Sequence, residues 1–243
     1  GEILIVFLFG VFLMRSAGCI LNDIVDKDFD RFVSRTKNRP LASDKLSSIE
    51  AFIFATVLIF IAFLLVLTTN TLTVQLSFVA VILAGVYPFL KRYTYLPQIF
   101  LGLAFGWSIP MTFAATTNSI PDIAWLLLIA NILWTVVYDT IYAMVDREDD
   151  LKIGIKSTAI LFDDADRTII AIIQVLALAA LAIVGKQASL NFVYYFCLIL
   201  GGCLFVYQSY LIKNREPKKC MQAFLNNNWF GLIVFIGLFV NYM

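Results

Sequence analysis

The sequence has 243 residues, of which 61% are hydrophobic and 14% are charged, and it contains no histidine. An ordinary soluble domain has about 45–50% apolar and about 25% charged residues. The excess of apolar residues excludes a soluble globular enzyme, a disordered chain, a fibrous repeat and a disulfide-stapled secreted module. We therefore expect an all-α, polytopic membrane protein.

Eight segments are long and apolar enough to cross a membrane, which takes roughly 20 residues. The fourth segment is the weakest prediction because Pro97 and Pro110 lie at or inside it, although membrane helices tolerate such breaks. We find none of the alternating ten-residue segments that are typical of transmembrane strands. The predicted spans are residues 2–21, 48–69, 71–90, 96–117, 120–141, 167–185, 188–212 and 226–243.

Basic residues fall in alternate loops of this scheme. Cytoplasmic loops of membrane proteins are enriched in Lys and Arg, so we expect the four basic loops to face the cytoplasm. The intervening loops contain only Lys186, and Arg15 lies within the first span. A nearly neutral net charge gives no indication of nucleic-acid binding. Sixteen of the 18 Lys and Arg residues lie in segments 22–47, 91–95, 142–167 and 213–225.

Nine of the 17 acidic residues fall in two short segments, each at the cytoplasmic end of a predicted span. If the first span continues as a helix, at about 100° per residue, Asn22, Asp26 and Asp30 lie on one face. In the second segment, residues 138–150, the spacing of Asp139, Asp146 and Asp150 also predicts a shared face, with Tyr142 about 60° away. The first segment comprises residues 22–30.

Carboxylates stacked along one helix face repel one another, and few basic partners lie near them in sequence. Lys27 and Arg147 are too few for nine carboxylates. Oxygen ligands without His or Cys favour Mg²⁺, Ca²⁺ or Mn²⁺ over zinc. Two such faces opposite each other would hold a diphosphate between metal ions. The alternatives are solvated helix ends, or a cation pathway, although only Asp139 is placed deeper in a span.

The two acidic segments, together with five flanking blocks, resemble the UbiA superfamily of intramembrane prenyltransferases. Within that superfamily, the pattern is most similar to the bacterial enzymes that prenylate 4-hydroxybenzoate in ubiquinone biosynthesis. One departure is Phe162-Asp163, where the family pattern has Phe-Gly. The flanking blocks are residues 15–23, 37–41, 87–93, 102–110 and 154–161.

The resemblance implies a nine-helix bundle around a central cavity that opens to lipid, in the inner membrane of a bacterium. This chain shows eight spans and begins with Gly1-Glu2. We therefore interpret residues 1–243 as a single transmembrane prenyltransferase domain that lacks the family's first helix. An inactive fragment or scaffold is the corresponding alternative.

The resemblance also implies a reaction. A polyprenyl group passes from polyprenyl diphosphate to the ring carbon beside the hydroxyl of 4-hydroxybenzoate, while Mg²⁺ neutralises the leaving diphosphate. Homogentisate, a naphthoate or haem are alternative acceptors, and an ion-coupled transporter is the alternative from another class. Asp23 and Asp149 are secondary candidates because they lie off the predicted faces. The predicted metal or Mg-diphosphate ligands are Asn22, Asp26, Asp30, Asp139, Asp146 and Asp150.

Further roles are assigned to basic and aromatic residues. Arg92 is predicted to bind the carboxylate of the acceptor, because arginine binds carboxylates bidentately. Asp146 is also a candidate to orient or deprotonate the phenol, and Asp139 is the other acidic catalytic candidate. Membrane topology and helix packing alone explain the same basic and aromatic residues. Candidate diphosphate contacts are Arg39, Lys37, Arg35 and Lys156, and candidate pocket residues are Tyr138, Tyr142 and Tyr87.

Overall fold

The computed structural model of the chain describes residues 1–32 and 36–242, and all its regular elements there are helices. Eight helical segments are long and apolar enough to cross a membrane, which confirms the predicted number of spans for the described residues. Three of these segments are composite: α4 with α5, α7 with α8, and α9 with the 3-10 turn Ile212–Asn214. The helices are α1 (Glu2–Asp30), α2 (Ser48–Val66), α3 (Thr71–Tyr93), α4 (Pro97–Gly106), α5 (Ser108–Thr117), α6 (Asp122–Ile153), α7 (Thr158–Phe162), α8 (Asp166–Gln187), α9 (Phe192–Leu211) and α10 (Pro217–Asn241).

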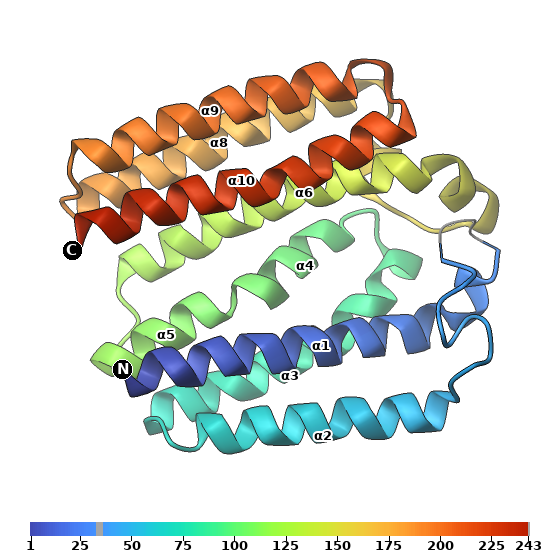
Figure 1. The fold of residues 1–243 in the computed structure, drawn as a ribbon, viewed down its shortest axis with the longest axis horizontal. Helices are drawn as coiled ribbons and strands as arrows, with labels where there is room; N and C mark the ends of the chain where they lie inside the picture. The colour runs from blue at the N-terminus through green and yellow to red at the C-terminus, as the bar shows by residue number, and fades with distance from the viewer. Residues whose placement is uncertain (33–35, 243) are drawn as a thin grey trace. The chain divides into compact units, whose positions relative to one another are not determined.

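The chain divides into two compact units. In the first, α1 packs against α2, α3 and α5 (Figure 1). In the second, α6 packs against α8 and α10, and α9 packs against α8 and α10. Unit 1 comprises residues 1–93 and 103–121, and unit 2 comprises residues 94–102 and 122–243.

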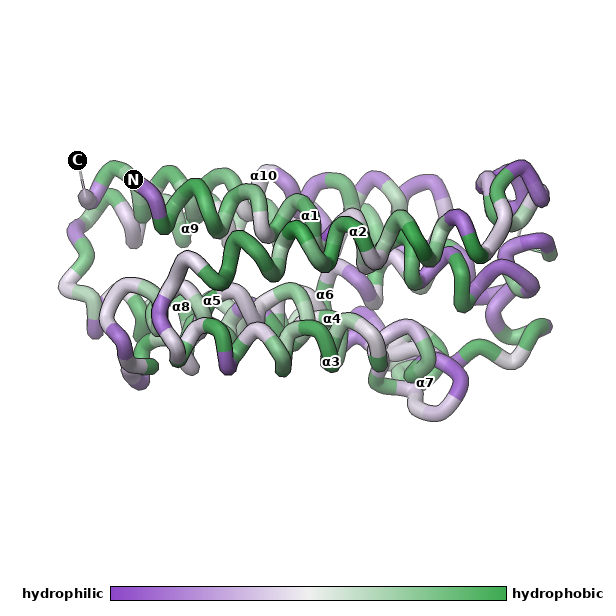
Figure 2. Tube along the Cα trace, turned by 90° about the horizontal axis from the view of Figure 1, so that it is seen from below, coloured by the Kyte–Doolittle hydropathy of each residue, from purple (hydrophilic) through white to green (hydrophobic). Residues whose placement is uncertain are grey.

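Large apolar side chains cover the outer surface of both units. Phe52 on α2 and Ile82 on α3 are exposed in unit 1, and Ile199 and Val206 on α9 are exposed in unit 2. Figure 2 shows that the helices are hydrophobic along most of their length and hydrophilic mainly toward their ends. A surface of this kind is stable in lipid and unfavourable in water. The chain is therefore a multi-pass membrane protein.

Two helices extend well beyond the apolar segments that predicted them. Helix α1 continues to Asp30 and α6 continues to Ile153, so each includes one acidic segment as regular helix. The prediction that each segment forms a helical face is therefore confirmed. Because the carboxylates lie on the last turns of long helices, their positions are set by the packing of the apolar turns before them.

The fourth span is broken, as its two prolines suggested. Helix α4 ends at Gly106 and α5 begins at Ser108, with Pro110 in its first turn. Proline has no backbone N–H, so a continuous helix would lose a hydrogen bond there. Within unit 1, the Trp107 indole donates to the carbonyl of Leu76 on α3 at 3.0 Å, which fixes the break against a neighbouring helix.

Gly102 is the point at which α4 and α6 make close backbone contact in unit 2. A Cβ atom at this position would lie 2.9 Å from the Ile132 Cα and 3.2 Å from the Thr135 Cβ. The Asn131 side chain donates to the Gly102 carbonyl at 3.1 Å. Small residues allow membrane helices to approach in this way, which gives a physical reason for glycine in this flanking block.

We expect Gly102→Ala to destabilise the protein by about 1–3 kcal/mol, because the added methyl group meets backbone atoms of α6 that cannot move away easily. Thermal unfolding in detergent measures the effect. Gly85→Ala on α3 is the matched control, since nothing lies within 4 Å of a Cβ built there. Equal unfolding temperatures for the two variants would contradict the close approach.

Asp163 adopts a backbone conformation that favours glycine. It follows α7 with φ 45° and ψ −124°, a region that residues with a Cβ rarely adopt. Its side chain forms an ion pair with Arg147 on α6. This geometry gives a physical reason for the glycine that the resemblance led us to expect at this position, because the turn has positive φ.

At this turn, we expect Asp163→Gly to be more stable than Asp163→Ala by at least about 1 kcal/mol. Both substitutions remove the ion pair, which is exposed and contributes about 0–1 kcal/mol. Only glycine relieves the backbone strain, so the difference between the variants isolates it. Unfolding temperatures in detergent measure the difference, and equal values would show that the turn is not strained.

Polar side chains also connect the helices inside unit 2. The buried Gln174 of α8 donates to Gln208 of α9 at 3.3 Å, and Gln208 donates to Asn226 of α10 at 3.0 Å. Such interhelical hydrogen bonds stabilise helix contacts in lipid, where association gains little from the hydrophobic effect. This amide ladder fixes the register of three helices.

Candidate functional site

The first acidic segment forms a set of paired groups on the last turns of α1. The Asn22 amide donates to Asp26 Oδ2 at 2.9 Å, which confirms that these two residues share a helix face. Asp26 is only 3% exposed, and its Oδ2 also forms an ion pair with Lys91 of α3. A buried carboxylate requires such a partner. Lys91 therefore compensates the most deeply buried charge of the motif.

Arg39 neutralises two further carboxylates of α1. Its Nη1 lies 2.8 Å from Asp23 Oδ1 and 2.9 Å from Asp30 Oδ2. The Thr36 hydroxyl donates to the Asp30 carbonyl at 3.2 Å. Thr36 and Arg39 thus contact residues of the last turns of α1.

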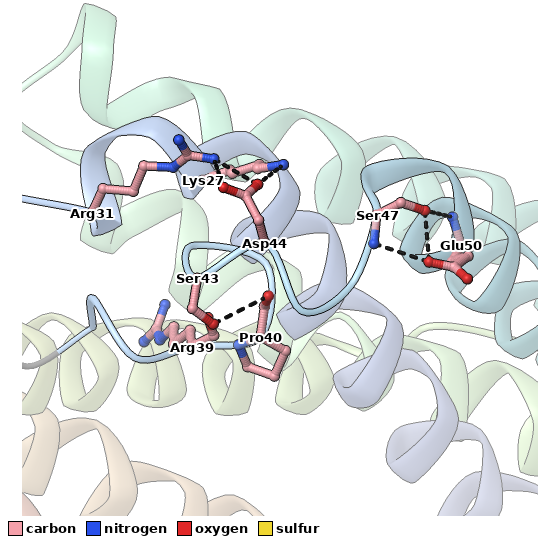
Figure 3. A network of polar contacts seen from close by, with 8 residues as sticks. All are labelled: Lys27, Arg31, Arg39, Pro40, Ser43, Asp44, Ser47 and Glu50. Carbon is pink, nitrogen blue, oxygen red and sulfur yellow. Dashed lines mark hydrogen bonds and ion pairs between the residues drawn. The ribbon is translucent and has the colours of Figure 1, made fainter.

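Asp44 anchors the other end of this segment, as Figure 3 shows. Its carboxylate lies 2.9 Å from the Lys27 ammonium and 2.7 Å from the Arg31 guanidinium. The hydrogen bond from Lys27, followed by the charge of Arg31, lowers the pKa of Asp44 from its ordinary value. Three residues later, Ser47 and Glu50 form a capping box at the start of α2.

The stability of segment 36–47 should depend on the ionisation of Asp44. Its folded-state pKa is depressed, so the stabilisation is present above the ordinary value of about 3.9 and is lost as pH falls through the folded-state pKa. We expect Asp44→Asn to lose amide protection in this segment at neutral pH, as the unaltered protein does in acid. Hydrogen-exchange protection factors measure this, and unchanged protection in Asp44→Asn would contradict it.

The second acidic segment lies on the last turns of α6. Asp139, Asp146 and Asp150 are half-buried, and the unbroken helix places them on one face. Asp149, off this face, lies 3.1 Å from Lys152. The cations within the two acidic segments pair with carboxylates outside them: Arg147 of the second segment pairs with Asp163, and Lys27 of the first pairs with Asp44.

An aromatic stripe runs along α6 next to this segment. Tyr138 meets Trp134 edge to face at a ring separation of 5.6 Å, and Tyr142 lies 4.8 Å from the Phe224 ring of α10. The Trp134 indole donates to Asn227 Oδ1 at 3.0 Å. These contacts hold the rings of α6 against α10, so packing and pocket lining remain compatible roles for both tyrosines.

The predicted basic residues have different surroundings. Arg92 of α3 donates to the Val25 carbonyl at 2.6 Å and lies 4.9 Å from the Phe29 ring, so its side chain connects α3 to α1. The Lys156 ammonium lies 5.4 Å from the Tyr95 ring in unit 2. Lys37 is exposed, Tyr87 is half-buried on α3, and Arg35 lies outside the described residues.

Sequence reasoning missed Lys91 as the partner of Asp26. Lys91 and Arg92 are adjacent, and both fit the topology rule equally well, so sequence offers no signal that separates them. The structure assigns Lys91 to the carboxylate and Arg92 to a backbone carbonyl.

The donor set of the first motif fits a hard divalent cation. Among the described residues, Asp26 Oδ1 and Thr135 Oγ1 are the buried side-chain oxygens without a hydrogen-bond partner. No group of three Asp, Glu or Cys side chains in the described residues is arranged to hold a metal ion. Mg²⁺ typically takes one or two protein carboxylates and completes its shell with water and phosphate oxygens. The unpartnered Asp26 Oδ1 is an oxygen of the kind that Mg²⁺ takes as a ligand.

One open pocket on unit 1 is separate from these residues. It has a volume of about 960 Å³ and lies at the other end of α1, against α5. Its lining includes Phe7, Val11 and Thr112, and no predicted site residue that the structure describes contributes to it.

Eight apolar helical segments in the described residues, two of which end in acidic turns, define a polytopic membrane protein. Residues 1–236 match the UbiA prenyltransferase family, and the chain belongs to this family.

Curated relatives carry a specific name. The 4-hydroxybenzoate octaprenyltransferase of Saccharophagus degradans is 56% identical over 240 residues, which cover 99% of this chain and 80% of that protein. The protein of the same name from Psychromonas ingrahamii is 55% identical over 241 residues, covering 99% of this chain and 84% of that protein.

Solved structures show the same fold. The apo structure of a UbiA homolog from Aeropyrum pernix K1 has a TM-score of 0.88 at 23% identity, covering 100% of this chain and 90% of that one. A UbiA homolog from Archaeoglobus fulgidus, solved bound to GPP and Mg²⁺, has a TM-score of 0.75 at 16% identity, covering 100% of this chain and 88% of that one.

Proposed function

We propose that this chain is a 4-hydroxybenzoate polyprenyltransferase. It transfers the polyprenyl group of a polyprenyl diphosphate to the ring carbon beside the hydroxyl of 4-hydroxybenzoate. The observation that carries the proposal is the identity of more than half the residues, along nearly the whole chain, to proteins with this named activity. The two acidic helix ends provide the chemical groups that the reaction needs.

The central chemical problem is the departure of diphosphate from an allylic carbon. Departure requires neutralisation of the negative charge that develops on the phosphate oxygens. Bound Mg²⁺ supplies this neutralisation as a Lewis acid. The proposed ligands are side chains at the ends of α1 and α6, with Asp23 and Asp149 in support. They are Asn22, Asp26, Asp30, Asp139, Asp146 and Asp150.

Basic side chains of the protein help to neutralise the negative charge of the leaving diphosphate. Arg39 lies among the carboxylates of α1, and this position supports a role for its guanidinium in binding a phosphate oxygen of the donor. Lys156 has a similar role in unit 2. Lys37 and Arg35, in the segment that carries Arg39, are further proposed diphosphate contacts.

The acceptor 4-hydroxybenzoate requires a cation that binds its carboxylate and an acidic residue that orients or deprotonates its phenol. Arg92 binds its carboxylate, and Asp146 orients or deprotonates its phenol, with Asp139 as a second acidic group. Tyr138, Tyr142 and Tyr87 line the pocket, where they keep water from capturing the allylic cation before the ring does. The fixed edge-to-face contact between Tyr138 and Trp134 supports this role because it holds an aromatic wall next to Asp139.

The membrane orientation follows from the basic loops. We place the protein in the inner membrane of a bacterium, with segment 31–47 and the loop after α6 on the cytoplasmic side. The positive-inside rule supports this orientation.

Substitution of single carboxylates tests the metal assignment. We expect Asp26→Ala and Asp146→Ala each to lower prenyl transfer by at least about 100-fold, as loss of a transition-state charge contact does. Membrane insertion should be unchanged. The assay follows transfer from geranyl diphosphate to 4-hydroxybenzoate in detergent.

Asp28→Ala is the matched control for these variants. Asp28 belongs to the same acidic segment but is exposed and lies off the shared face, so its loss should leave activity near that of the unaltered protein. Full activity in Asp26→Ala and Asp146→Ala, or activity that survives EDTA, would remove the metal from the proposal.

A separate prediction concerns the acceptor. Arg92→Ala should raise the KM for 4-hydroxybenzoate far more than the KM for the prenyl diphosphate, by about tenfold or more. Lys213→Ala removes another exposed basic residue beside a span and should change neither KM. Equal effects of Arg92→Ala on both substrates would leave Arg92 with its contacts to α1 and no role at the carboxylate.

A further inference from the structure

A buried hydrogen bond ties the start of α4 to the start of α7 in unit 2. Gln98 is 3% exposed, and its Oε1 accepts from the Thr158 backbone N–H at 3.2 Å. The first N–H groups of a helix have no partner within the helix. The glutamine side chain therefore satisfies a backbone group that would otherwise be buried without a hydrogen bond.

Thr158 is also held from a second side. Its hydroxyl lies 2.6 Å from the hydroxyl of Thr140 on α6, and Thr140 donates to the Val136 carbonyl at 2.5 Å. Because the single proton of the Thr140 hydroxyl is used for that carbonyl, the Thr158 hydroxyl is the donor between the two. Both threonines are fully buried. Thr140 directly follows Asp139, so α7 is fixed to the helix that carries the second acidic segment.

The loop held by these contacts is the one that carries Lys156. Helix α6 ends at Ile153 and is followed by Gly154 with φ 74°, and the Ile155 N–H donates to the Asp150 carbonyl at 3.0 Å. The Lys156 ammonium lies 5.4 Å from the Tyr95 ring, three residues before Gln98. One short segment, residues 95–98, thus contacts both the side chain of Lys156 and the backbone two residues after it.

We propose that Gln98 is a positioning residue that acts through Thr158 to place the Lys156 ammonium for binding the diphosphate of the prenyl donor. This inference rests on the proposed function. Apolar packing alone gives no reason for a glutamine here, since burying an unpaired amide is unfavourable and an apolar side chain would fill the space. The amide instead sets the position of the loop, and Tyr95 sets the direction of the lysine side chain by a cation–π contact.

The first test compares two buried glutamines of the same unit. Gln98→Leu removes the acceptor, and Gln208→Leu removes a fully buried amide from the ladder of α8, α9 and α10. Both variants lose a buried hydrogen bond and should lose stability. Only Gln98→Leu should raise the KM for geranyl diphosphate, by about tenfold, while the KM for 4-hydroxybenzoate stays unchanged. The same rise in Gln208→Leu would overturn the proposal.

A double-mutant cycle tests whether Gln98 acts through Lys156. Lys156→Met alone should raise the KM for geranyl diphosphate, and Gln98→Leu should add little in the Lys156→Met background, because the group that it positions is already absent. Additive effects would overturn the proposal, as would an unchanged KM in Lys156→Met.

Tyr95 provides a test that does not depend on the folding of Gln98→Leu. Its side chain is 42% exposed, and a change there leaves the core of unit 2 intact. Tyr95→Phe retains the aromatic face and should keep the KM for geranyl diphosphate, whereas Tyr95→Leu should raise it severalfold. Equal KM values for these two variants would overturn the placement of Lys156. Absence of prenyl transfer in the unaltered protein would instead refute the proposed function.

Discussion

The charge of Asp26 is the constraint on which the first unit depends. A carboxylate buried at the end of an apolar helix is strongly unfavourable unless opposite charge and hydrogen bonds compensate it. Lys91 of α3 and Asn22 of α1 provide that compensation at one oxygen. Arg39 does the same for Asp23 and Asp30. Lys91 at the end of α3 and Arg39 after α1 are thus both held at the carboxylates of α1. Arg39, which we propose as a diphosphate contact, is therefore positioned by the ion pairs that neutralise these carboxylates.

The second unit positions its acidic helix mainly by neutral contacts. Gly102 allows α4 to approach α6 closely, Asn227 orients Trp134, and the buried pair Thr140 and Thr158 joins α6 to α7. None of these contacts changes with ionic strength, because none involves a charged group. The carboxylates of α6 therefore stand on a helix that is fixed before any ligand or counter-ion arrives. A reaction centre needs such rigidity, since small displacements of catalytic groups lower rates strongly.

Local periodicity and composition predicted much of this arrangement. The eight spans, the break near Pro110 and the shared faces of the two acidic segments follow from the spacing of apolar and acidic residues along single helices. The partners Lys91 and Gln98 do not, because each contact joins residues that are about 60 positions or more apart in the chain. Lys27 and Arg147, the cations nearest in sequence, pair with Asp44 and Asp163 instead. Proximity along the chain was a poor guide to ion pairing once loops folded back on helices.

The bridge that Arg39 forms between Asp23 and Asp30 has a consequence for how this region folds. Many metal sites remain unfolded until the ion arrives, because their ligands repel one another and the binding energy of the ion is also their folding energy. Here the opposing charge belongs to Arg39 of the same chain, nine residues from Asp30 and sixteen residues from Asp23. The charges of Asp23 and Asp30 are compensated by Arg39 within the chain, so folding of this segment and binding of the proposed Mg²⁺ are separate equilibria.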